Sequence, residues 1–230
     1  MEIYTEWCKK PNSDPILNTY VACCLYALGK YKESYNEAEK GPKNEELTNR
    51  IRLHSAFKCR VGVAVMDHLH KLTNNVQDQL CKAGWEFLKG EFEEAIDIYN
   101  KIYVDKKYNA INIYKAMCYY KLDNYEDALK YVNSYLSNFK TSVVANNLKA
   151  AIEYSSTGNC NSAKKIIMSL QDILQMNNNK NDIKKIIEND YLLKHNLAVF
   201  DSDESNNHQK LKVNYLIIIF LCDIGIPKFN

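Results

Sequence analysis

The stretches KGEFEEAI, residues 89–96, and LDNYEDAL, residues 122–129, share one order of residue types and lie 33 residues apart. Each contains a turn-forming residue, a polar residue, an aromatic residue, two acidic residues, an alanine and an aliphatic residue, in that order. Degraded copies occur as GNCNSAK, residues 158–164, and LGKYKESY, residues 28–35. A fixed period of about 20–50 residues is typical of an architecture built from one repeated supersecondary unit.

Each copy carries the residue types that a tight helical hairpin needs. Gly or Asp ends the first helix and allows the turn. The aromatic residue two positions later packs at the start of the second helix, and the alanine deeper in that helix must be small because the two helices approach closely. A second small residue precedes each turn residue by seven positions. The residues assigned to these structural roles are Ala22, Gly29, Ala83, Gly90, Phe92, Ala95, Ala116, Tyr125, Ala128, Ala151, Gly158 and Ala163.

The pattern resembles the tetratricopeptide repeat, a helix–turn–helix unit of about 34 residues. The resemblance implies an all-α fold, a right-handed superhelical solenoid of antiparallel helix hairpins. We expect hairpins at about 15–40, 44–73, 76–104, 108–138 and 141–176, and a sixth first helix at about 182–200. The second hairpin matches the consensus least, with Gly62 as its only turn marker.

The repeat array is therefore assigned to residues 1–200, and residues 201–230 to a divergent, truncated C-terminal segment. The polar stretch 201–212 leaves no room for a full second helix, so the apolar run 215–222 would lack a covering helix. Solenoids need polar caps at their ends, which is why we expect the chain to be a fragment or to be wrong at its C-terminus.

Composition excludes several function classes. The chain has 7 Gly and 4 Pro in 230 residues, which favours helices with short connections. A net charge of +2, with only three arginines, gives no basis for nucleic-acid binding. The apolar run 215–222 is too short for a membrane-spanning helix, which needs about 20 residues. We expect no nucleic acid, no membrane insertion and no small-molecule substrate.

Eight cysteines occur without any Cys-x-x-Cys pair, and most lie in apolar helical stretches where a free thiol behaves as a small hydrophobe. The acidic start MEIYTE does not resemble a signal peptide. Both features indicate a reducing, cytoplasmic compartment.

The histidine and cysteine pairs are weak candidates for chemistry. His68 and His70 are two positions apart on an expected helix, so their side chains diverge and cannot share one metal ion. We expect both to be partly exposed helix residues. Cys23 and Cys24 also point in different directions, and neither has a base beside it in the sequence.

The acidic pairs Glu93-Glu94 and Glu126-Asp127 could suggest general acid catalysis. They recur in the first turn of a helix, where carboxylates favour the positive end of the helix dipole, so the structural interpretation is preferred. No Gly-rich phosphate loop or nucleophile signature occurs. We predict no catalytic residues, no metal, no cofactor and no enzymatic activity.

Positions on the first helix of each hairpin are expected to line a concave groove. The candidate partner-binding residues there are Tyr26, Leu80, Phe87, Ile113, Met117, Tyr120, Leu148 and Ile152. Such a strip suits an amphipathic helix of a partner, whereas repeats that resemble chaperone-tail binders carry Lys and Asn to clamp a terminal carboxylate. The alternative is that neighbouring repeats or other parts of the chain cover this strip.

Strings outside the repeat consensus resemble the family of intraflagellar transport protein 56, a tetratricopeptide protein of intraflagellar transport complex B. The most specific are NRIRLH, residues 49–54, and KHNLAVF, residues 194–200, and further matches are LGKYKE, EAIDIY, CYYKLD and NLKA. The strings occur in the family's order along the chain.

The resemblance implies a non-catalytic scaffold in the cytoplasm and cilium that supports cilium assembly and transport of motility-related cargo. Its partners would be complex B subunits and ciliary cargo. The alternative is a repeat adaptor in another pathway, such as a co-chaperone or a ubiquitin-related adaptor, because the fold alone does not determine the partner.

Overall fold

The computed structural model describes residues 2–102 and 108–177. All regular secondary structure in these two ranges is α-helical, which confirms the all-α class and the hairpin repeat. The chain divides into two compact units between Lys89 and Gly90, and each is described by itself. The sixth first helix expected at 182–200, the C-terminal run 215–222 and the array limit at residue 200 lie outside the described residues, so they stay predictions.

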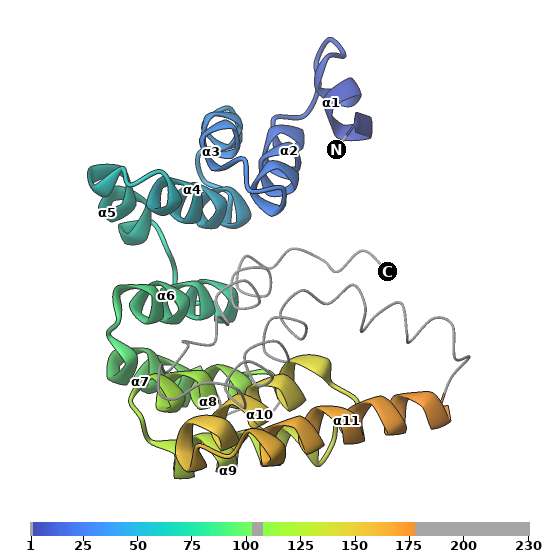
Figure 1. Cartoon of the computed structure of the whole chain (residues 1–230). Helices are drawn as coiled ribbons and strands as arrows, with labels where there is room; N and C mark the ends of the chain where they lie inside the picture. Colours follow the sequence, from blue (N-terminus) through green and yellow to red (C-terminus); the bar gives the residue numbers. More distant parts are fainter. Residues whose placement is uncertain (1, 103–107, 178–230) are drawn as a thin grey trace. The chain divides into compact units, whose positions relative to one another are not determined.

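The first unit contains α1 (Glu2–Cys8), α2 (Ile16–Ala27), α3 (Tyr31–Glu39), α4 (Glu46–Lys58), α5 (Gly62–His70) and α6 (Val76–Lys89). Successive helices from α1 to α5 pack against each other, and α4 also contacts α2 and α6 (Figure 1). Contact between the first helices of successive hairpins is the packing expected of a helical repeat. Helix α1 was not predicted, because residues 2–8 precede the first copy of the repeat pattern.

The second unit contains α7 (Phe92–Ile102), α8 (Ile111–Lys121), α9 (Tyr125–Leu136), α10 (Val143–Thr157) and α11 (Cys160–Asn177). Helices α8 and α9 form one hairpin and α10 and α11 the next, and α10 contacts both α8 and α9 (Figure 1). Side-chain caps fix where two of these helices begin. The Asn124 side chain accepts a hydrogen bond from the Asp127 N–H, and Ser142 Oγ accepts one from the Ala145 N–H.

A residue with a left-handed backbone lies at the turn within each of the five predicted hairpins. Three are Gly29, Gly90 and Gly158, with φ of 76°, 94° and 68°. The other two are Asp123 and Arg60, with φ of 56° and 59°. The assignment of the second turn to Gly62 is wrong, because Gly62 is the first residue of α5 and Arg60 makes the turn. A left-handed backbone is unfavourable for a residue with a Cβ atom, so the residue type arginine does not indicate a turn at this position.

In every hairpin, the residue seven positions before the turn residue and the residue five positions after it are buried. All seven alanines assigned to these positions come from the four hairpins that match the consensus, and every one of the seven is fully excluded from solvent. The remaining positions are occupied by Leu53 and Val65 around Arg60, and by Ser34 after Gly29, all of them buried. Leu53 of α4 and Val65 of α5 stand where the other hairpins have small residues, which explains why the second hairpin matches the consensus least.

Ser34 replaces the alanine of the first hairpin, and its hydroxyl is satisfied inside the core. Ser34 Oγ donates to the Ala22 carbonyl oxygen over 2.8 Å, and the Ser55 hydroxyl lies 2.8 Å from Ser34 Oγ. Because the Ser34 proton goes to the carbonyl, Ser55 is the donor in the second bond. The two hydroxyls therefore connect α2, α3 and α4 without leaving a buried polar atom unpaired.

Candidate partner-binding surfaces

The residues predicted to line a groove lie on α2, α6, α8 and α10, and the structure places most of them in the interior. Seven of the eight are at most 8% exposed: Tyr26, Leu80, Phe87, Ile113, Met117, Leu148 and Ile152. Tyr26, for example, belongs to a cluster with Ala22, Cys23, Ala38 and Ile51. Counting positions along a helix gives the direction of a side chain but not what covers it. Partner contact by these residues stays a prediction.

Tyr120 differs from the other groove residues because it is only half-buried. Its hydroxyl lies 3.0 Å from Ser155 Oγ of α10, and its ring centroid lies 6.0 Å from that of Tyr125. Burial raises the pKa of the Tyr120 hydroxyl. Tyr120 thus connects α8 to α10 inside the second unit, and it is the most exposed of the eight predicted groove residues.

The string NRIRLH, residues 49–54, lies in the middle of α4, and every one of its residues is buried. Two arginines and a histidine in a helical segment that is buried on every side are unusual, because buried charges need partners. Each of the three side chains finds its partner on a neighbouring helix or loop. The string therefore holds the first unit together through polar contacts that the repeat consensus does not contain.

Arg52 binds the C-terminal end of α3. Its Nε donates to the Ala38 carbonyl oxygen over 3.1 Å, and its Nη2 donates to the Gly41 carbonyl oxygen over 3.0 Å. The last carbonyls of a helix lack intrahelical partners, and a cation there is favoured by the helix dipole. Arg52 Nε also lies 3.2 Å from a carboxylate oxygen of Glu39. The guanidinium thus fixes where α3 ends and the loop to α4 begins.

The loop at Gly41 is packed too tightly for a side chain. A Cβ built on Gly41 would lie 2.5 Å from Thr19 Oγ1 and 3.1 Å from the Ala38 carbonyl oxygen. Thr19 Oγ1 itself lies 2.7 Å from Thr48 Oγ1, which joins α2 to α4 beneath the loop. Sequence reasoning missed Gly41, and the Gly-Pro pair at 41–42 was the available signal.

Arg50 pairs with Asp78 across α4 and α6. Arg50 Nη1 donates to Asp78 Oδ1 over 2.7 Å, and both side chains are buried. The other carboxylate oxygen, Oδ2, accepts from the Thr73 N–H at 2.7 Å and from the Thr73 hydroxyl at 2.9 Å. Asn75 in turn accepts a hydrogen bond from the Asp78 N–H and so caps α6. The carboxylate is thus satisfied on both oxygens.

His54 is completely buried between α4 and α6. Its Nε2 lies 3.1 Å from Cys81 Sγ. Burial, assisted by the positive charges of Arg50 and Lys58, lowers the pKa of His54 to about 3. The imidazole is therefore neutral at physiological pH and acts as a packed, hydrogen-bonding group rather than as a charge.

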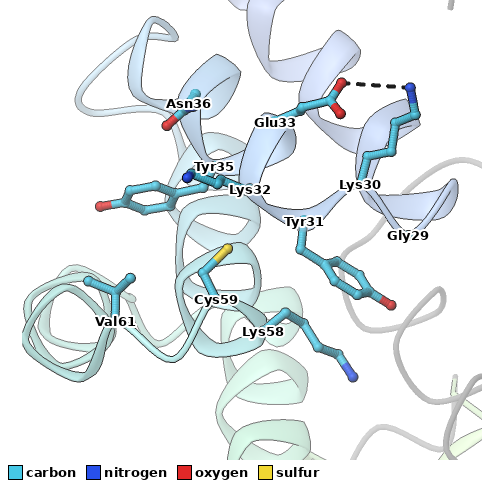
Figure 2. Close-up of a pocket in the computed structure, with 10 residues that line it drawn as sticks. All are labelled: Gly29, Lys30, Tyr31, Lys32, Glu33, Tyr35, Asn36, Lys58, Cys59 and Val61. Atoms are coloured by element: carbon cyan, nitrogen blue, oxygen red, sulfur yellow. Dashed lines mark ion pairs between the residues drawn. The ribbon is translucent and has the colours of Figure 1, made fainter.

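A hollow of about 650 Å³ opens between the start of α3, the end of α4 and the turn into α5 (Figure 2). We call it the α3–α4 hollow. Its lining combines lysines, tyrosines and small residues, namely Gly29, Lys30, Tyr31, Lys32, Glu33, Tyr35, Asn36, Lys58, Cys59 and Val61. None of the predicted groove residues lines it, because most of its lining belongs to turns and to α3, the second helix of the first hairpin. It is a surface that sequence reasoning missed.

The weak candidates for chemistry occupy structural positions. His68 is buried beside Tyr35, with ring centroids 6.2 Å apart, so the expectation that it is partly exposed is wrong. Burial lowers its pKa. Cys23 is buried and Cys24 is half-buried. Within residues 2–102 and 108–177, no group of three His, Cys, Asp or Glu side chains is placed to hold a metal ion.

None of the helices in the described ranges is both long enough and apolar enough to span a bilayer.

Comparison with known proteins gives two consistent results. The family model described as "Intraflagellar transport protein 56" matches residues 1–215. An "Intraflagellar transport protein 56 homolog" from Caenorhabditis elegans is 26% identical over 211 residues. That match covers 88% of this chain and 37% of the worm protein, so the chain spans a little over a third of the length of this relative.

Proposed function

The chain belongs to the intraflagellar transport protein 56 family, and on that premise we propose that it is a non-catalytic scaffold of intraflagellar transport complex B. The observation that carries the proposal is the family match over residues 1–215, which includes every hairpin of the two described ranges. In this role the chain would bind other complex B subunits and support cilium assembly and transport of motility-related cargo.

The fold is suited to such a role because hairpin repeats present many side chains from several helices on one surface. The polar contacts of residues 49–54 add rigidity to the first unit, and a rigid surface loses less entropy on binding than a mobile one. Exposed large apolar side chains, among them Val63, Met66 and Trp7, are available for contact.

Affinity purification tests the proposal. The full chain, tagged at one end, is expressed in ciliated cells from which the endogenous family member has been removed. We expect complex B subunits to co-purify in fixed proportion to the tagged chain at moderate salt. A tagged hairpin-repeat co-chaperone, expressed at the same level, is the matched control and should recover none of them.

The outcome discriminates between the two candidate functions. Recovery of chaperones or ubiquitin ligase subunits in place of complex B subunits would support an adaptor in another pathway and would contradict the proposal.

A further inference from the structure

We propose that the α3–α4 hollow binds an acidic peptide segment that carries one aromatic or aliphatic side chain. The segment belongs to a partner protein, so this inference rests on the proposed scaffold function and assigns a chemistry to one of its partners. The hollow has about 650 Å³ of space, enough for a few residues of an extended chain. The charge of the lining and the start of a helix support an anionic ligand here, and the aromatic rings support its apolar side chain.

The charge of the hollow is positive. Its lining contains three lysines, Lys30, Lys32 and Lys58, and one glutamate, Glu33, which gives a formal charge of +2. The whole chain of 230 residues also has a net charge of +2, so the hollow is much more positive than the average surface. Glu33 and Lys30 form an exposed pair at 3.7 Å, which costs little to rearrange (Figure 2). An acidic segment complements this lining.

Two tyrosine side chains that line the hollow are held in place by contacts with buried rings. The Tyr31 ring lies 5.1 Å from that of Tyr26, which is buried in the core, and the Tyr35 ring lies 6.2 Å from that of buried His68. Lys58 Nζ lies 5.6 Å from the Tyr31 ring centroid, and Figure 2 shows the two side chains extending in the same direction. Preorganised rings reduce the entropy that a ligand must overcome. They provide the contact for its apolar side chain.

The first turn of α3 also lines the hollow. The first N–H groups of a helix have no intrahelical partners and carry the positive end of the dipole. The N-cap residue of α3 is Lys30, whose ammonium group is a donor only and cannot cap these N–H groups. A carboxylate of the ligand can therefore accept from these N–H groups while its neighbours pair with the lysines. Val61, at the opposite wall, is 42% exposed and offers an apolar edge.

The test measures binding of a fluorescent peptide to the full chain by anisotropy. The probe is a ten-residue peptide of alternating Glu and Asp with one central Phe. We expect it to bind, and to bind about tenfold more weakly to the variant Lys30→Glu/Lys32→Glu. Both substituted side chains are exposed, and acidic residues are favoured in the first turn of a helix, so the fold should be retained. A thermal melt checks this.

The matched control is Lys130→Glu/Lys140→Glu, which makes the same change of charge at exposed positions outside the hollow. It should bind the probe as the wild type does. A second peptide with Ser in place of Phe should bind more weakly than the probe. Equal loss in both charge variants, equal binding of both peptides, or no binding to the wild type would each overturn the proposal.

Two further outcomes separate this inference from its premise. If the probe fails to bind while complex B subunits still co-purify with the wild type, the docking proposal fails and the scaffold function stands. If sedimentation shows that the chain self-associates and that Lys30→Glu/Lys32→Glu makes it monomeric, the occupant is a second copy of the chain and the assignment to a partner protein is overturned.

Discussion

Arg50 of α4 and Asp78 of α6 form an ion pair of 2.7 Å in the interior of the first unit, and each carboxylate oxygen of Asp78 accepts at least one hydrogen bond. Helix α4 belongs to the second hairpin, whereas α6 begins the next one. The pair therefore connects two successive repeats, and it does so through residues that the repeat consensus does not specify.

Removal of one partner of this pair is expected to be far more damaging than removal of both. Asp78→Leu leaves the Arg50 guanidinium buried beside an apolar side chain and should lower the free energy of unfolding by about 3–5 kcal/mol. The double variant Arg50→Met/Asp78→Leu removes both charges and should lose much less than the sum of the two single changes. Urea unfolding of the wild type, Arg50→Met, Asp78→Leu and the double variant measures the coupling. Additive losses would show that the pair is not an energetic unit.

The free energy of unfolding should decrease as the pH falls below about 6, because His54 is held neutral in the folded chain. Its pKa is lowered to about 3 in the folded chain, whereas an unfolded histidine has a pKa of about 6.5. The unfolded state therefore binds one more proton between these values, and stability is lost as the pH falls. From pH 6 to pH 5 the expected loss is about 1.2 kcal/mol from this group alone.

Denaturant unfolding of the wild type and of His54→Gln at the two pH values isolates this contribution. His68, whose pKa is also lowered, is present in both proteins and cancels in the comparison. The variant should show the smaller change with pH. An identical change in the two proteins would mean that His54 can be protonated without unfolding the chain.

Two glycines of the first unit should respond to alanine in opposite ways. In Gly41→Ala the new Cβ would lie within 3.1 Å of three atoms of Thr19, Thr48 and Ala38, so we expect a loss of about 1–3 kcal/mol. In Gly62→Ala the new Cβ meets nothing within 4 Å and lies in a helix, so stability should rise by up to about 1 kcal/mol. Thermal melts of both variants make the comparison. Similar shifts would contradict the close packing of the loop after α3.

The turn between α4 and α5 offers a stabilising substitution. Arg60 has a left-handed backbone that costs a residue with a Cβ atom about 1–2 kcal/mol. Arg60→Gly should recover about 1 kcal/mol, offset in part by the greater entropy of glycine in the unfolded chain. Arg60→Ala keeps the Cβ and is the control without this gain. If the alanine variant gained as much stability as the glycine variant, the turn would not lie at residue 60.

The sequence predicts the hairpins well because their signals are local. Gly29, Gly90 and Gly158 mark turns that need a left-handed backbone, and alanines at fixed spacing mark the helix contacts. The turn at Arg60 is invisible because nothing in its residue type indicates a positive φ. The predicted limits of the five hairpins agree with α2 to α11 to within a few residues over the described ranges.

The interior polar contacts and the surfaces could not be predicted in the same way. Arg50 and Asp78 are 28 residues apart, and only the stacking of α4 on α6 shows that they meet. The predicted groove residues are mostly buried because helix packing, which a single sequence does not encode locally, decides what covers a side chain. The α3–α4 hollow escapes prediction for the same reason, since it is assembled from α3, the end of α4 and the turns beside them. The partner-binding role of the predicted groove residues stays a prediction.

Two-colour imaging in living cilia tests the central claim most directly. The chain, fused to one fluorescent protein, is followed together with a complex B subunit fused to another, in cells that lack the endogenous family member. The scaffold function predicts that both signals move together along the axoneme in both directions and at the same speed. A chain that stays in the cell body, or that diffuses in the cilium while the complex B signal moves, would contradict it.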